Sequence, residues 1–254
     1  MSYADLDAAR REIATACRVM AHRGLVEDIL GHISIRVDDR HLLIRCRGPQ
    51  EAGLAFTAPE DVRVVEFESG QVVDDPDGSY VPPSELPIHT SVLRGRSDVS
   101  CVVHAHPPDV VVASLANLPL LPLVGAYNIP ATRLAHQGIP THPRSVLIRT
   151  DALAAEMVES LSDSVVLVLK GHGLVSTGDS VPEAVLRALH VDTLAQLTLG
   201  VHAVGAHPEP IPEADFAELP DLGSGFNEAI LWRHHVTALH AAGLGLADPS
   251  EDGL

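Results

Sequence analysis

The spacing of apolar and polar positions near the start of the chain predicts one helix followed by several short strands. The first apolar residues share one stripe at helical spacing: Leu6, Ile13, Cys17 and Met20. We therefore expect an amphipathic helix from Asp5 to about Arg23, which Gly24 ends. Three β-like runs follow between Asp, Gly and Pro residues: His32–Val37, His41–Cys46 and Val62–Glu68. The stretch Val72–Pro83 is expected to form a loop, and Ser84 to cap a helix over Glu85–Arg94.

Strand-like and helix-like segments alternate in the central part of the chain. The expected strands are Val99–His106, Ser145–Arg149 and Ser164–Lys170, and the expected helices are Pro108–Ala116 and Asp151–Leu161. A long helix should run from Val181 to about Val204, with Ser180 as its cap and Pro182 in its first turn. The Pro- and Gly-rich stretch His207–Gly225 predicts a surface excursion before a last helix over Asn227–Ala242.

This order of elements fits one α/β domain better than two. We expect residues 1–205 to form the domain, and residues 206–254 to form a tail of loop and helix. The tail is expected to pack on the same domain or on a neighbouring subunit.

Composition and charge narrow the classes of partner. Hydrophobic residues make up 46% of the 254 residues but aromatic residues only 3%, so the core must be built from Val, Leu, Ile and Ala. The formal net charge of −17 argues against a nucleic-acid partner, because phosphate binding needs clustered Lys and Arg. The three cysteines are odd in number and show no paired spacing, which argues against a disulfide framework. The polar N-terminus and the lack of an apolar run of roughly 18 residues predict a cytoplasmic chain with no membrane partner.

Histidines at the ends of two apolar runs are candidate metal ligands. His104 and His106 are two apart after Cys101-Val102-Val103, so both rings should lie on one face of a strand. His172 lies between two glycines directly after the second apolar run, where the backbone can turn sharply. Three neutral imidazoles suit Zn, Mn or Fe and leave positions open for a substrate. The spacing alone leaves two readings open, a metal site and unrelated structural histidines.

Four motifs, in order and with matching separations, resemble the class II aldolase/adducin family over roughly residues 5–205. They are Gly31-His32-Ile33-Ser34, Ser84-Glu85-Leu86-Pro87-Ile88-His89, His104-Ala105-His106-Pro107 and Gly171-His172-Gly173-Leu174. The resemblance implies an α/β fold of three layers, α/β/α, with a mainly antiparallel central sheet. It also implies homo-oligomers, usually C4 tetramers, with active sites at subunit interfaces.

The resemblance further implies the parts of a metal-dependent lyase. It assigns His104, His106 and His172 as ligands of one divalent ion per subunit (Zn, Mn, Co or Fe). It assigns Glu85 as the catalytic acidic residue, which ligates the resting ion or moves a proton once substrate displaces it. The shared chemistry is bond cleavage through an enolate-type carbanion that the metal stabilises.

Three departures from the sugar-phosphate members of the family argue against a phosphorylated substrate. His32 replaces the Asn of the opening motif, Thr57-Ala58-Pro59 replaces a Thr-Gly or Ser-Gly pair, and Pro83-Ser84 replaces Ser-Ser. Phosphate cradles use small residues and free backbone N–H groups, and proline removes an N–H. Arg45 and Arg47 suit a carboxylate instead. This pattern resembles the family's decarboxylases of hydroxylated aromatic dicarboxylates.

We therefore predict a carboxy-lyase that acts on a small-molecule carboxylate. The predicted substrate-binding residues are Arg45, Arg47, His32, Ser84 and Thr57, and further candidates are His89, Tyr127 and His234. His89 lies one helical turn beyond Glu85 and either orients that carboxylate or packs, whereas His234 belongs to a tail that could cover a neighbouring site. Three alternatives stay open: an aldolase acting on a non-phosphorylated hydroxy-keto acid, a non-haem iron oxygenase, and a non-catalytic adducin-like domain.

Overall fold

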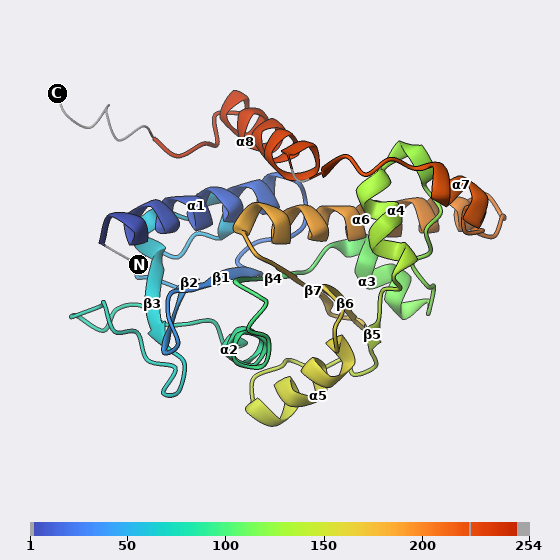
Figure 1. The fold of residues 1–254 in the computed structure, drawn as a ribbon. Helices are drawn as coiled ribbons and strands as arrows, with labels where there is room; N and C mark the ends of the chain where they lie inside the picture. Colours follow the sequence, from blue (N-terminus) through green and yellow to red (C-terminus); the bar gives the residue numbers. More distant parts are fainter. Residues whose placement is uncertain (1–2, 224, 248–254) are drawn as a thin grey trace.

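A computed structural model describes residues 3–223 and 225–247 of the chain (Figure 1). Seven strands form its sheet: β1 (His32–Arg36), β2 (His41–Arg45), β3 (Val62–Glu66), β4 (Cys101–Ala105), β5 (Thr141–His142), β6 (Val166–Leu169) and β7 (Gly173–Gly178). The α-helices are α1 (Tyr3–His22), α2 (Leu86–Gly95), α3 (Pro108–Leu115), α4 (Ile129–His136), α5 (Asp151–Leu161), α6 (Val181–Ala203), α7 (Glu213–Glu218) and α8 (Leu231–Ala241). None of the helices in these residues is long and apolar enough to cross a membrane.

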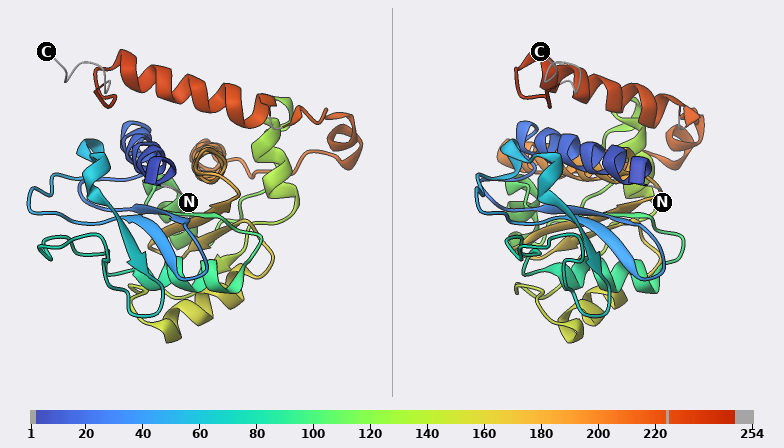
Figure 2. Two further views of the ribbon diagram at one scale, coloured as in Figure 1. Left: turned by 60° about the vertical axis from the view of Figure 1, so that its left-hand side comes forward. Right: turned by 90° about the vertical axis from the view of Figure 1, so that its left-hand side faces the viewer.

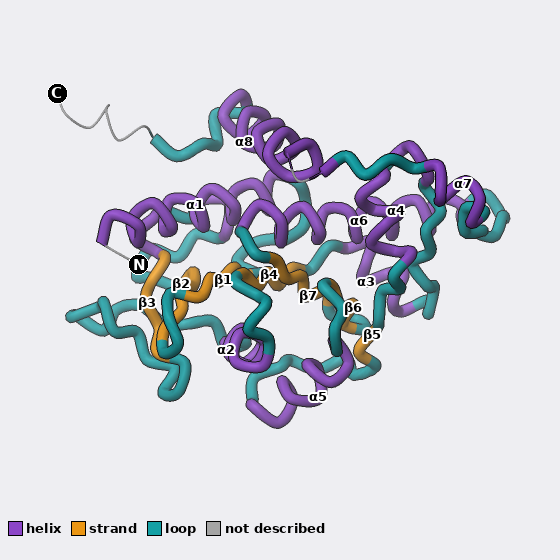
Figure 3. Tube along the Cα trace, viewed as in Figure 1, coloured by secondary structure: helices purple, strands orange, loops and turns teal. Residues whose placement is uncertain are grey.

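The sheet is mixed. Its strand order is β3-β2-β1-β4-β7-β6-β5, and β5 pairs with β6 in parallel while every other neighbouring pair is antiparallel. The expectation of a mainly antiparallel sheet thus needs the correction that one edge of the sheet is parallel. The tube in Figure 3 shows the strands running through the middle of the molecule with helices on both sides.

Strand alternation divides the core between the two faces of the sheet. On β4, Val103 packs with α1 and α6, whereas Val102 packs with α2 and α5 on the opposite face. Figure 1 shows α1 and α6 covering one face and α2 and α5 covering the other, and Figure 2 shows the same layers from the side. His32, Ser34 and His104 have the same parity as Val102 and therefore face α2.

The helices are predicted well wherever an amphipathic stripe and a cap coincide. The α6 helix begins as predicted, with the Ser180 hydroxyl accepting from the Glu183 N–H at 3.2 Å. The prediction that Ser84 caps α2 is wrong, because Glu85 occupies the N-cap and no side chain caps the helix. The predicted strand Ser145–Arg149 is also wrong: the segment is irregular, and the parallel strand nearby is Thr141–His142.

Several elements lie where no regular structure is predicted, and β7 and α4 are the two that matter most for the fold. The strand β7 starts at Gly173 and is rich in Gly, Ser and Thr, so its pattern is weak; its pairing with β4 and β6 makes it a central strand. The helix α4 follows Asn128, whose side chain accepts from the Ala131 N–H.

The C-terminal segment covers the α1/α6 side of the molecule (Figures 1 and 2). The guanidinium of Arg18 in α1 donates to the carbonyls of Leu244 and Gly245, both at 3.0 Å. Leu239 of α8 is fully buried in the core. The last α-helix begins at Leu231 rather than at the predicted Asn227, because a π-helical turn, Gly225–Ile230, precedes it.

Candidate metal centre

The end of β4 delivers two histidines to the α2 side of the sheet. His104 is fully buried on that face, and His106 follows directly after the strand. The Nδ1–H of His104 donates to the Leu174 carbonyl at 2.9 Å, because a carbonyl can only accept. The Nε2 lone pair of His104 is consequently free and points toward His106, whose Nε2 lies 2.7 Å away.

The turn between β6 and β7 delivers the third histidine. Gly171 adopts a left-handed φ of 63°, which allows the sharp turn that presents His172. A Cβ on Gly173 would lie 2.1 Å from the Ala105 carbonyl oxygen, so glycine is required for β7 to approach β4 here. The His172 ring centroid lies 4.9 Å from those of both His104 and His106.

Glu85 supplies a carboxylate from the start of α2. Its Oε1 accepts the backbone N–H of Ile148 at 2.9 Å, which turns Oε2 toward the histidines. Oε2 lies 3.3 Å from the Nε2 of His104 and 3.4 Å from the Nε2 of His172. Burial by itself raises the pKa of Glu85, but the proximity of these two histidines outweighs burial and holds the pKa well below its usual range.

This donor set fits a divalent cation. One ligand atom from each of Glu85, His104, His106 and His172 lies within 4.8 Å of all the others. Burial, followed by the neighbouring His104 and His172, lowers the pKa of His106 to about 3, which keeps that imidazole in the neutral form that binds metals. Three imidazoles and one carboxylate match the ligands that Zn²⁺ and related ions prefer.

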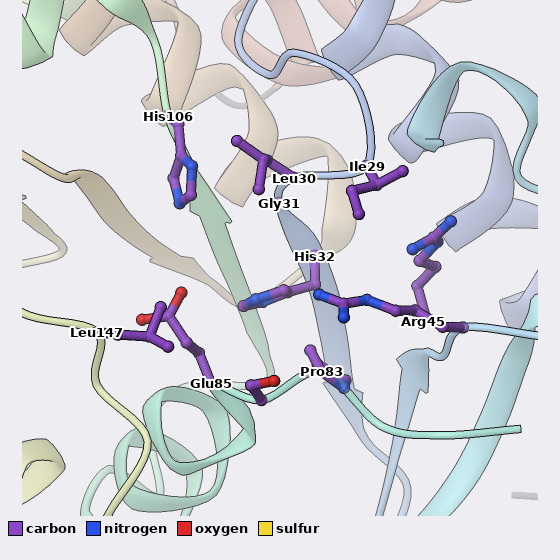
Figure 4. Close-up of a pocket in the computed structure, with 11 residues that line it drawn as sticks. Ile29, Leu30, Gly31, His32, Arg45, Pro83, Glu85, His106 and Leu147 are labelled. Atoms are coloured by element: carbon purple, nitrogen blue, oxygen red, sulfur yellow. The ribbon is translucent and has the colours of Figure 1, made fainter. Parts of the chain in front are cut away.

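A hollow beside this cluster brings together most of the residues predicted to bind substrate. His32, Arg45, Arg47 and Ser84 line it together with Glu85 and His106, and Figure 4 shows His32, Glu85 and His106 gathered around the same space. The remaining walls are apolar or small: Ile29, Leu30, Gly31, Pro83 and Leu147. A pocket with apolar walls and two arginines at its edge suits an anion that carries an apolar ring.

The two arginines differ in their surroundings. Arg45 is 5% exposed and pairs with the Glu51 carboxylate through Nη2, while its buried Nε has no hydrogen-bond partner among the described residues. Arg47 is exposed, and its backbone bridges to Val81. Arg45 is thus held in place by a buried ion pair, whereas Arg47 lines the hollow as an exposed residue.

Three candidates lie away from this hollow within the single chain. The Thr57 hydroxyl is fully buried and donates to the Leu54 carbonyl at 3.0 Å. Tyr127 is 78% exposed and lines a different cavity, beneath the C-terminal segment. His234 lies on α8, with its ring 5.3 Å from that of His235.

Two contributors to the site differ from what the sequence predicts. His89 was expected to orient Glu85 or to pack, but its hydrogen bonds go to His32 and Ser34, both at 2.6 Å. The register of β1 and β4 places His32 opposite His104, on the face of the sheet that α2 covers. His32 can therefore reach His89 of α2. Ile148 holds Glu85 through its backbone, and a backbone N–H leaves no signal in the side-chain pattern.

Comparisons with known proteins agree with this geometry. The family model described as Class II Aldolase and Adducin N-terminal domain matches residues 11–199. The chain is 52% identical to a 3,4-dihydroxyphthalate decarboxylase of Arthrobacter keyseri, over 92% of this chain and 95% of that protein. It is 50% identical to a protein of the same name from a Terrabacter species, over 91% and 97% of the two chains. The fold is similar to a crystal structure of an aldolase II superfamily protein from Pseudomonas syringae, with a TM-score of 0.77 and 23% identity over 94% of each chain. The chain therefore belongs to the class II aldolase and adducin N-terminal domain family.

Proposed function

We propose that this chain is a metal-dependent carbon–carbon lyase that decarboxylates 3,4-dihydroxyphthalate or a closely related hydroxylated aromatic dicarboxylate. The observation that carries the proposal is the convergence of three imidazoles and Glu85 beside a hollow edged by two arginines. Relatives that share 44–52% identity over most of the chain bear the name of that decarboxylase.

The described side chains account for binding and orientation of such a substrate. A divalent cation held by His104, His106 and His172 would supply Lewis acidity toward oxygen atoms of the substrate. Arg45 and Arg47, which both line the hollow, would hold a carboxylate. The apolar walls of the hollow would exclude water from the ring.

Decarboxylation requires an electron acceptor and a proton. A proton first adds to the ring carbon that carries the carboxylate, and the ortho hydroxyl gives up its own proton and takes the keto form. When the bond between that carbon and the carboxylate then breaks, CO2 leaves and the electron pair moves through the ring onto the keto oxygen, which restores aromaticity while the added proton stays on the ring carbon. We propose that Glu85 carries this proton, since its Oε2 faces the centre while its Oε1 is held by Ile148.

We also propose that the chain forms a homotetramer in which the tail after residue 205 serves a neighbouring subunit. Tyr127 and His234 lie away from the site of their own chain, so they are candidates for contributing to another. Light scattering on the purified protein tests this proposal: a monomer at micromolar concentration would exclude it.

The experiment that tests the proposed reaction measures CO2 and aldehyde release in parallel. The purified protein, loaded separately with Zn²⁺, Mn²⁺, Co²⁺ or Fe²⁺, is incubated with 3,4-dihydroxyphthalate and with a non-phosphorylated hydroxy-keto acid. We expect CO2 from the dicarboxylate and about one bound ion per chain. Aldehyde without CO2 would favour the aldolase alternative, and oxygen consumption with Fe²⁺ would favour an oxygenase.

Matched variants separate loss of the metal from loss of the fold. His104→Ala with His106→Ala should abolish both metal binding and turnover. His142→Ala is the control, because His142 is also a buried histidine but bonds Ser160 at 2.8 Å, away from the centre. A double variant that retained the ion would contradict the ligand assignment.

A further inference from the structure

A buried chain of three hydrogen-bonding side chains leads from the core to the hollow. His32 and Ser34 project from the same face of β1 toward α2, where His89 lies between them. The Ser34 hydroxyl is 2.6 Å from the Nδ1 of His89, and the Nε2 of His89 is 2.6 Å from the Nδ1 of His32. Ser34 and His89 are fully inaccessible to solvent, and His32 is 7% exposed. Only the far side of the His32 ring remains for the hollow (Figure 4).

The chain has a preferred direction of hydrogen bonding, which Ser34 sets. Among the described residues, the Ser34 hydroxyl has no hydrogen-bond partner other than His89. If the His89 Nδ1–H donated to Ser34, the buried hydroxyl hydrogen would itself have no acceptor, and an unsatisfied buried donor is unfavourable. The hydroxyl therefore donates to Nδ1 of His89. A neutral His89 then carries its hydrogen on Nε2 and donates it to Nδ1 of His32.

Both histidines of the chain are neutral. Burial lowers the pKa of His89 to about 3, with a further contribution from His104. Because the Nδ1 of His32 accepts the hydrogen bond from His89, that nitrogen carries no hydrogen of its own. A neutral His32 that accepts at Nδ1 must carry its one hydrogen on Nε2, which is the nitrogen left for the hollow.

We propose that Ser34 and His89 are positioning residues that fix His32 as an Nε2–H donor to a carboxylate oxygen of the substrate, and so keep His32 from acting as a fourth metal-binding imidazole. The proposal rests on the proposed function for the identity of the acceptor. A dicarboxylate has two carboxylates. One would bind the arginines, and the other would accept the hydrogen bond from the Nε2–H of His32.

The contrast with His104 shows how the partner decides the role of each ring. His32 and His104 are directly opposite on paired strands, with ring centroids 5.0 Å apart. A carbonyl oxygen, that of Leu174, accepts the Nδ1–H of His104 and leaves a lone pair on its Nε2. The Ser34 hydroxyl donates to His89, and His89 donates to the Nδ1 of His32, so the hydrogen of the His32 ring is on its Nε2. Two adjacent histidines thus present opposite groups, one a ligand and the other a hydrogen-bond donor.

The tautomer can be measured without turnover. Long-range 1H–15N spectra of the Zn²⁺-loaded protein, labelled with 15N-histidine, distinguish protonated from unprotonated ring nitrogens, and His32→Gln assigns the His32 signals. We expect wild-type His32 to be protonated on Nε2 alone. Ser34→Ala should give a mixture of the two His32 tautomers, and Ser34→Thr or Ser34→Cys should restore the single tautomer. An unprotonated Nε2 in the wild type, or an unchanged tautomer in Ser34→Ala, would overturn the proposal.

Kinetics and a matched control complete the test. Ser160→Ala removes a hydroxyl from the equally buried His142 and should change neither the His32 spectrum nor turnover. We expect Ser34→Ala to raise the KM for 3,4-dihydroxyphthalate about 3- to 10-fold and His32→Ala to raise it at least about 10-fold, as expected for a hydrogen bond to a charged group. Metal content should stay at the wild-type value in both, and loss of the ion in His32→Ala would instead make His32 a ligand. Absence of CO2 release by the wild type would remove the proposed substrate while leaving the spectroscopic result valid.

Discussion

Replacing Gly173 by alanine should damage the candidate metal centre more than the fold. The added Cβ would lie 2.1 Å from the Ala105 oxygen and 3.0 Å from the Cδ2 of His106, whereas ordinary contacts begin at 3.4 Å. β7 and β4 must therefore separate by about 1.3 Å at the point where His106 and His172 meet. Metal–ligand distances tolerate only about 0.2 Å, so the separation exceeds the tolerance several-fold. Overpacking of this kind usually costs about 1–3 kcal/mol of stability.

The assay compares metal affinity and stability in two variants of the same strand. Gly178→Ala is the control, because its Cβ would lie 2.9 Å from the Ala184 backbone nitrogen at the far end of β7. Both variants should lower the urea midpoint, but only Gly173→Ala should weaken Zn²⁺ binding, by at least about tenfold in calorimetry. Wild-type Zn²⁺ affinity in a folded Gly173→Ala protein would refute the proposed requirement for close approach of the two strands.

Two further predictions concern charges outside the metal centre. Burial, and then Asp109, raise the pKa of Asp192 to about 6. Between about pH 4 and 6 the folded state therefore keeps a proton that the unfolded state releases. The free energy of unfolding should fall as the pH rises through this range. Asp192→Asn should thus stabilise the protein at pH 7.5, by at most about 3 kcal/mol in urea titrations, and should give no gain near pH 4. The control is Asp77→Asn at an exposed position, which should give no gain at either pH. Glu51→Ala strips the buried Arg45 of its carboxylate and should cost about 3 kcal/mol, with a higher KM for the dicarboxylate; an unchanged KM would remove Arg45 from the substrate site.

The sequence points to the histidine cluster partly through local patterns, although these patterns alone fit unrelated structural histidines as well as a metal site, and the family resemblance assigns the ligands. Side chains alternate along a strand, so His104 and His106 are predicted to lie on the same face. The glycines on both sides of His172 predict a turn without any knowledge of the fold. The long helices are equally local, since stripe and cap lie within one segment. By contrast, the segment 145–149 reads as a strand by its apolar content, yet the Ile148 N–H bonds Glu85 instead of a neighbouring strand. Its structure is set by a residue more than sixty positions away, which no local pattern encodes.

The role of each histidine depends on tertiary contacts in the same way. His32, His89 and His104 all stand in motifs of the family, and their residue type offers three equivalent candidate ligands. The register of β1 against β4 brings His32 within ring contact of His104, and the face shared with Ser34 supplies a hydroxyl instead of a carbonyl. A histidine whose inner nitrogen meets a carbonyl turns a lone pair outward, and one that receives a hydrogen bond turns an N–H outward. Counting histidines therefore overestimates the number of candidate ligands, and we propose that the hydrogen-bond partner behind each ring decides whether it binds the cation or the substrate.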